Sequence, residues 1–345
     1  MKNVPSKKKP TRRPETERPQ DAKSGLREGV EGIYARLTKT RSIVLHPTVL
    51  VLATYVLLLL SKLIDIAIIN RENEYYSVVI LQMMIFLLPG AIWCKFSGEK
   101  YTSGLRLRMV KANSLLLVLS ASALMASGGL LMSILFGGLD SLSGNFSLYD
   151  TFISKDNGTV PNKIYLVMAY AVLPAICEEF VYRGILCREY EKGGVLRAVL
   201  LSSVFFALLH FNLQNLPIYL FAGVILAMTM YAGRSLLCAI LAHFLYNIFG
   251  IFGQPYMNNL YQITGSSRLF LILVTAVCII SAALFCGEAA RLYRLYLYKG
   301  YSAEYRQPVI KTAAGLRRAY LDVIRQPSAI ACLGIYILAL IISWI

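Results

Sequence analysis

The chain has 345 residues, of which 57% are hydrophobic and only 16% are charged, and its formal net charge is +16. About a quarter of the residues in a soluble domain are charged, so this composition excludes an ordinary soluble protein and indicates one that crosses a membrane several times. The basic residues lie between apolar runs, where they act as topology signals and contact anionic lipid, so no nucleic-acid partner is predicted.

The first 41 residues are polar and contain Lys-Lys-Lys and Arg-Arg runs and several prolines. A basic segment with few apolar residues cannot bury a hydrophobic core. Residues 1–41 are therefore expected to form a largely disordered cytoplasmic tail.

Nine apolar segments follow, and about 20 residues cross the hydrocarbon layer as a helix. Eight segments are predicted to be spans, and the last, 328–345, is a shorter candidate for a final transmembrane helix. We therefore expect an all-α fold, a polytopic transmembrane helix bundle with eight spans, or nine if the last segment inserts. The segments are Pro47–Ile69, Tyr75–Trp93, Ser114–Leu135, Ile164–Cys187, Val195–Phe211, Leu216–Ala232, Leu236–Phe252, Leu269–Cys286 and Ser328–Ile345.

Basic clusters fall on alternate connections between these segments. By the positive-inside rule they predict a cytoplasmic N-terminus, and the expected location is a bacterial plasma membrane. Residues 288–327 are rich in Arg, Lys and Tyr, which predicts a basic cytoplasmic segment on anionic lipid headgroups. The stretch 42–287 is then one transmembrane domain.

Two adjacent carboxylates, Glu178 and Glu179, end the apolar run of the fourth segment. Ionised groups in a membrane cost several kcal/mol unless they are paired, so they indicate a functional site. Glu179 is four residues before Arg183 and can pair with it on one helix face. Glu178 points about 100° away and stays available. The alternative is a helix end whose charges mark the water interface.

Three further polar residues, His210, His243 and Asn247, fall in apolar segments downstream. Polar groups at membrane depth face the bundle interior, where they bind each other or serve only as helix-packing hydrogen bonds. If the fifth helix begins near Arg197, His210 lies about 20 Å along it, whereas Glu178 and His243 lie only about 10 Å from their helix ends. Contact between them requires the fifth helix to start deeper, tilt or bend.

Three motifs stand in order on three of these segments: Glu178-Glu179-Phe-Val-Tyr-Arg183, Phe206-Ala-Leu-Leu-His210 and His243-Phe-Leu-Tyr-Asn247. They resemble the EExxxR, FxxxH and HxxxN motifs of the CPBP (Abi) intramembrane proteases, which include the CAAX-prenyl endopeptidases. The similar core runs over residues 164–252, and the resemblance makes 42–287 a transmembrane protease domain.

The resemblance implies an intramembrane endopeptidase. Glu178 and His210 would activate a water molecule, His243 and Asn247 would stabilise the oxyanion, and Glu179 with Arg183 would support the site. Glu178, His210 and His243 are alternatively a two-histidine, one-carboxylate set for a divalent metal such as zinc, although the chain has no HExxH motif. The sequence does not decide between these two roles.

The substrate implied is a hydrophobic peptide or a membrane protein, and nothing in the sequence indicates whether it carries a lipid. Two alternatives to a protease remain. In the first, the chain is a non-catalytic membrane protein that binds a peptide, confers bacteriocin immunity or binds a partner protein. In the second it is a transporter, which the absence of an internal sequence repeat disfavours.

Overall fold

The structure is a computed structural model that describes residues 46–67, 79–97, 104–137, 163–298 and 312–344. All regular elements within these ranges are helices, and none is a strand. The predicted all-α fold is therefore confirmed, whereas the predicted tail, residues 1–41, lies outside the described ranges.

In its described part, each of the nine predicted apolar segments overlaps a helix. Within the described ranges, six helices are long and apolar enough to cross a membrane, and a seventh span results if Arg317–Ile324 and Pro327–Ile342, which are bent by 64°, form one. Pro47–Ser61 and Val195–Leu209 are apolar but shorter. The chain is thus a multi-pass membrane protein, and the count of eight or nine spans stays a prediction. The six helices are Val79–Phe96, Ala112–Gly137, Lys163–Gly193, Leu216–Gly233, Leu236–Gly253 and Ser267–Tyr296.

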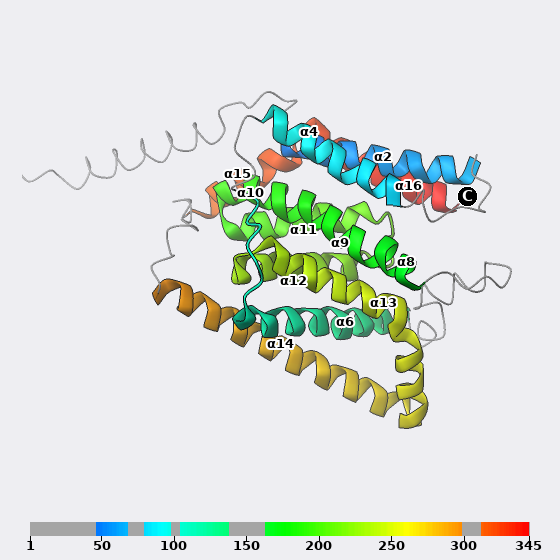
Figure 1. The fold of residues 1–345 in the computed structure, drawn as a ribbon. Coiled ribbons are helices and arrows are strands. Elements are labelled where there is room, and N and C mark those ends of the chain that lie inside the picture. The colour runs from blue at the N-terminus through cyan, green and yellow to red at the C-terminus, as the bar shows by residue number, and fades with distance from the viewer. Residues whose placement is uncertain (1–45, 68–78, 98–103, 138–162, 299–311, 345) are drawn as a thin grey trace, which may run out of the picture. The chain divides into compact units, whose positions relative to one another are not determined.

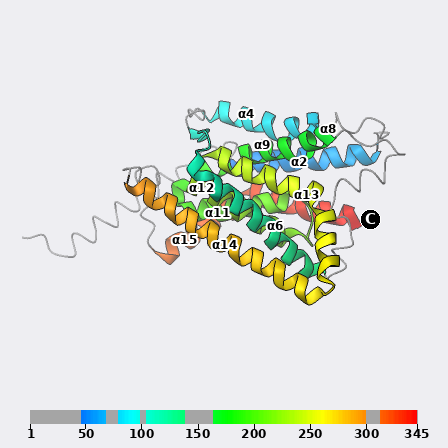
Figure 2. The same ribbon diagram turned by 60° about the horizontal axis from the view of Figure 1, so that its bottom comes forward.

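The motif-bearing helices lie among helices from both ends of the chain (Figure 1). The upstream elements are α2 (Pro47–Ala67), η3 (Met83–Leu87), α4 (Leu88–Phe96), η4 (Ala112–Ser114) and α6 (Leu115–Gly137). The downstream elements are α11 (Val195–Leu209), α12 (Leu216–Gly233), α13 (Leu236–Thr264), α14 (Ser267–Tyr298), α15 (Ala313–Ile324) and α16 (Pro327–Trp344). Helices α12, α13 and α14 each pack on α6, α11 packs on α12, and α2 pairs with α16. Figure 2 shows α14 beside α6 from a second direction.

The fourth span changes helix type along its length. Its elements are α8 (Lys163–Val167), η6 (Met168–Val172), α9 (Leu173–Glu179), η7 (Phe180–Leu186), α10 (Cys187–Tyr190) and η8 (Glu191–Gly193). Both η6 and η7 are π-helical, which is uncommon and is often found at functional sites. Pro174 follows η6 directly within this continuous helix, where it lacks the N–H that an α-helical residue donates.

Helices α11 and α12 approach each other closely at Gly223. A Cβ atom placed on Gly223 would lie 3.0 Å from Cβ and 3.1 Å from Cα of Ser203. Small residues at such crossings let helix backbones approach within a membrane, where packing rather than the hydrophobic effect drives association. The spacing brings the motif on α11 next to the backbone of α12.

The connection that precedes α6 is hydrogen-bonded to the fourth span and to the start of α13. Arg106 has a left-handed backbone with φ 52°, and its guanidinium forms a bidentate pair with Glu191 at 2.8 and 3.0 Å. Its carbonyl accepts the backbone N–H of Leu236 at 3.0 Å, and Tyr231 donates to Glu191 at 2.9 Å. These bonds join the end of the fourth span to the turn between α12 and α13.

The predicted boundary at residue 287 falls inside α14, which continues without a break to Tyr298. Of the predicted surface segment 288–327, the described parts are therefore the end of α14 and the short helix α15. Helix α15 buries Ala319 and Val323 and exposes Arg317 and Arg318, an amphipathic pattern typical of a helix at the membrane surface.

Candidate active site

Glu179 and Arg183 form a buried ion pair within the fourth span. Arg183 Nη1 lies 2.7 Å from Glu179 Oε1, and both side chains are fully buried. The pairing predicted from the four-residue spacing is thus present. A charge buried at this depth is tolerated because its partner is also fully desolvated and hydrogen-bonded.

His243 joins this pair from α13. Its Nδ1 atom lies 2.9 Å from Glu179 Oε1, the same oxygen that accepts from Arg183. The His243 ring is also buried. A carboxylate bound to one ring nitrogen fixes the orientation of an imidazole and directs the other nitrogen elsewhere. Glu179 therefore acts as the orienting partner of His243.

Arg183 links the fourth span to two further helices. Its Nη2 donates to the backbone carbonyl of Gly223 on α12 at 2.9 Å. Its guanidinium carbon lies 4.3 Å from the ring centroid of Phe206 on α11, a cation–π contact. The supporting role expected for Glu179 and Arg183 is consistent with this central position.

The ring of Phe206 is the point where the three motifs meet. Its centroid lies 5.1 Å from that of His210 and 5.9 Å from that of His243, both in edge contacts, in addition to the Arg183 contact. The expected mismatch in depth along the fifth helix does not separate them. Helix α11 is only 15 residues long, and His210 is its C-terminal cap rather than a residue within it.

The orientation of the His210 ring follows from a hydrogen bond and a stacking contact. Its Nδ1 atom lies 3.0 Å from the carbonyl oxygen of Phe206, and its ring stacks on Tyr219 with centroids 3.7 Å apart and planes 15° apart. A carbonyl oxygen only accepts, so Nδ1 must donate its hydrogen. In the neutral ring Nε2 then carries the lone pair, which is the arrangement required of a base.

Glu178 is half-buried and does not take part in the Glu179–Arg183 pair. Its Oε2 atom is buried and accepts no hydrogen bond from the described residues. A desolvated acceptor of this kind is costly unless a water molecule or a ligand binds it, so this oxygen is a candidate site for one.

Asn247 lies one turn beyond His243 on α13 and is half-buried. Its side chain makes no hydrogen bond to another side chain of the site within the described part of the chain. The expected pairing of His243 and Asn247 around an oxyanion is therefore represented here only by their common helix.

The residues named for a metal site are not arranged as one. In the described part of the chain, no three side chains of His, Cys, Asp or Glu are placed so that they could hold a metal ion. Nδ1 of each histidine is held by a protein oxygen, from Glu179 for His243 and from the Phe206 carbonyl for His210, and such a bond leaves the other ring nitrogen able to bind a metal. The described arrangement nevertheless does not group Glu178, His210 and His243 around one position for a metal.

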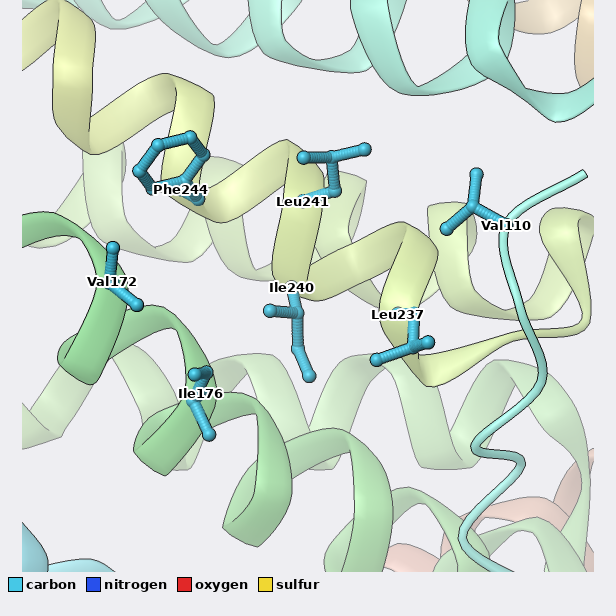
Figure 3. A pocket seen from close by; sticks show the side chains of 7 residues that line it. All are labelled: Val110, Val172, Ile176, Leu237, Ile240, Leu241 and Phe244. Carbon is cyan, nitrogen blue, oxygen red and sulfur yellow. The ribbon is translucent and has the colours of Figure 1, made fainter. Parts of the chain in front are cut away.

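An apolar groove of about 380 Å³ lies between the fourth span and α13 (Figure 3). Val172 and Ile176 line it from the fourth span, and Phe244 is among the residues that α13 contributes. Ile176 stands two residues before Glu178, and Phe244 follows His243 directly. The other lining residues are Val110, Leu237, Ile240 and Leu241.

Two residues of the site were not predicted from the sequence. Tyr219, which stacks on His210, and Gly223, whose carbonyl binds Arg183, lie in an apolar run without a polar pattern. For Gly223 a signal exists, because a glycine within a membrane helix indicates close approach of another backbone. No comparable signal marks Tyr219.

Comparison with known proteins bears on the segment that carries the site. No curated protein and no solved structure matched the chain. Residues 160–249 match the family model described as type II CAAX prenyl endopeptidase Rce1-like. The match covers α8 to α13 up to Phe249 and includes all three motifs. Residues 160–249 are thus similar to the CAAX-type membrane proteases, and the resemblance predicted from the motifs is confirmed.

Proposed function

We propose that the protein is an intramembrane endopeptidase that hydrolyses a peptide bond in a hydrophobic or membrane-associated substrate. The observation that supports this most strongly is the meeting of the three motifs at Phe206, where Arg183, His210 and His243 all contact one ring. Burying two histidines and two carboxylates within a membrane costs free energy. Because they lie together, a common catalytic role is favoured over separate roles in helix packing.

Glu178 and His210 are the pair that we assign to water activation. Nε2 of His210 or the carboxylate of Glu178 takes a proton from water as the water oxygen bonds to the substrate carbonyl carbon. The same proton passes to the nitrogen of the scissile amide as the carbon–nitrogen bond breaks, so the products are an acid and an amine. A positioned base of this type contributes about 10²- to 10⁴-fold to a rate.

His243 is assigned to the oxyanion. When its ring is charged, Nδ1–H donates to Glu179 and Nε2–H is available to the negative oxygen of the tetrahedral intermediate. Asn247, one turn further along α13, supplies a second donor when substrate is bound. Donors fixed before the reaction stabilise this charge without reorganisation. Glu179 and Arg183 support the donor rather than contact the substrate.

The groove beside the fourth span is assigned to the apolar part of the substrate. All seven side chains that line it are apolar, so a polar peptide segment would lose hydrogen bonds to water on entering. Two of its lining residues, Ile176 and Phe244, stand within two positions of Glu178 and His243 in the sequence, on the same two helices. A hydrophobic peptide or a membrane protein is therefore the proposed partner, and anionic lipid is proposed for the basic segments. The bacterial plasma membrane and the cytoplasmic N-terminus remain part of this proposal.

One observation favours a second function, that of a non-catalytic membrane protein. The bonds of Glu179 and Arg183 join the fourth span to α12 and α13, as expected of polar groups that only hold helices together. In that case Glu178→Gln, which preserves shape, leaves function intact.

The deciding experiment is cleavage of a library of hydrophobic peptides by purified protein in liposomes, read by mass spectrometry. Wild type is compared with Glu178→Gln, His210→Ala and, as a control outside the site, Ile272→Ala on α14. We expect both site variants to abolish cleavage and the control to retain it. Cleavage that survives both site variants indicates a contaminating protease and contradicts the assignment.

A further inference from the structure

The turn that presents His210 is anchored from outside the matched segment. Tyr55 on α2 is completely buried, and its hydroxyl donates to the backbone carbonyl of Phe205, the residue before Phe206. Residues 160–249 carry the family match, and α2 lies more than 90 positions upstream of it in the chain. The bond therefore connects a helix with no motif residue to the last turn of α11.

The last turn of α11, next to His210, is tightened by hydrogen bonds between residues three apart. The N–H groups of His210 and Phe211 bond to carbonyls three residues back, those of Ala207 and Leu208, at 3.3 and 3.2 Å. This leaves the carbonyl of Phe206 without an α-helical N–H partner, and the His210 ring donates to it instead. The direction of the His210 ring thus depends on the geometry of this turn.

The residue after His210 holds an unfavourable backbone conformation. Phe211 has φ 47°, in the left-handed region that bulky residues avoid. Its buried ring makes an edge contact with Tyr55, with centroids 5.7 Å apart, and a tilted contact with Tyr336 on α16 at 6.4 Å. Strained residues persist where their surroundings hold them, and here two tyrosines do so.

The two tyrosines belong to one unit. Helices α2 and α16 pack along each other, and the hydroxyls of Thr48 and Ser328 are hydrogen-bonded between them. Tyr336 is buried, but its hydroxyl has no hydrogen-bond partner within the described residues. The rings of Tyr55 and Tyr336 therefore both pack against the ring of Phe211, and Tyr55 also donates a hydrogen bond to α11.

We propose that the α2–α16 pair positions His210, with Tyr55 as the positioning residue that holds the last turn of α11. The catalytic consequence rests on the proposed function, whereas the positioning itself does not. Tyr55 contacts no reacting group. It fixes the carbonyl of Phe205 and the ring of Phe211 on either side of His210. The direction in which Nε2 points therefore depends on a helix about 150 positions upstream in the chain.

The test compares Tyr55→Phe with Tyr336→Phe, a matched pair because each variant removes one buried hydroxyl and keeps the ring. Only Tyr55 uses its hydroxyl for α11. The first readout is the rate at which diethyl pyrocarbonate modifies His210, followed by mass spectrometry and divided by the rate at His243. The second is the separate measurement of kcat and KM. Phe211→Gly, which tolerates the left-handed backbone but lacks the ring, is a second variant in case Tyr55→Phe does not fold.

We expect Tyr55→Phe and Phe211→Gly to change the ratio of modification rates severalfold, and to lower kcat by about 10- to 100-fold with KM unchanged. Tyr336→Phe should behave as wild type. An unchanged ratio in folded Tyr55→Phe protein overturns the proposal, as does an equal effect of the two tyrosine variants. If the ratio changes but wild type cleaves no peptide, the positioning stands and the proposed function fails.

Discussion

One carboxylate oxygen of Glu179 lies 2.9 Å from Nδ1 of His243, although the two residues are 64 positions apart in the chain. The same oxygen accepts from Arg183. A single buried atom therefore balances one cation and orients one imidazole. The neighbouring carboxylate, Glu178, does neither. The same substitution at the two adjacent glutamates should therefore have different effects on stability.

Glu179→Gln should unfold more easily than wild type. The change leaves the Arg183 guanidinium buried without its counter-charge, which typically costs about 3–5 kcal/mol. Cleavage should also fall, because His243 loses its orienting partner. Thermal unfolding in detergent and peptide cleavage measure the two effects separately.

Glu178→Gln is the matched control, with the same change one residue earlier. Its stability should stay within about 1 kcal/mol of wild type, since no ion pair is broken and one buried charge is removed. Its cleavage should fall by at least about 10²-fold. Equal destabilisation by the two substitutions would contradict the division between an orienting and a reacting glutamate.

Gly223→Val should destabilise the protein by about 1–3 kcal/mol, the usual cost of overpacking. The added Cβ meets the backbone of Ser203, which has no room to move without shifting α11. Gly250→Ala on α13 is the control, because nothing lies within 4 Å of its added Cβ, and it should be neutral or slightly stabilising. Unfolding midpoints of the two variants in the same detergent give the comparison. A neutral Gly223→Val variant would show that the α11–α12 crossing is not tight.

Ile176→Trp should fill part of the apolar groove and raise KM for hydrophobic peptides while kcat for bound substrate changes little. The control is Ile272→Trp, an equally large addition on the exposed face of α14. Steady-state kinetics over a series of peptides with increasing apolar length measure the effect. A KM that stays constant across the series would show that the substrate binds elsewhere.

Removal of divalent metals should leave cleavage unchanged. The three candidate ligands do not form a metal site in the described structure. The assay compares wild type before and after dialysis against 1,10-phenanthroline, with metal analysis of both samples. Loss of cleavage that zinc restores would move Glu178, His210 and His243 from water activation to metal ligation.

The order of the motifs and the pairing of Glu179 with Arg183 could be predicted from the sequence. Spacing along one helix determines which residues share a face, and a charge at membrane depth must find a partner. The all-α multi-pass fold could be predicted for the same reason, since runs of apolar residues leave the backbone no alternative to helix.

The contacts between helices could not be predicted in this way. The spacing places His243 and Asn247 one turn apart on a helix, but nothing in it indicates that Nδ1 of His243 binds Glu179 on another helix. Tyr219 and Tyr55 lie in helices that are apolar on every side, so no periodic pattern marks the face that meets His210. The depth of His210 depends on where α11 ends, and helix ends are poorly marked in sequence.

Of the two π-helical turns in the fourth span, η6 ends before Glu178, and η7 begins inside the motif at Phe180 and includes Arg183. Such a turn is equivalent to one inserted residue, and removing a residue rotates one side of a helix against the other by about 100°. A deletion within η6 would therefore turn α8 and leave Glu178, Glu179 and Arg183 in register with each other. A deletion between Glu179 and Arg183 would instead separate that pair. The fourth span can therefore accommodate a change of chain length at η6, but not between Glu179 and Arg183.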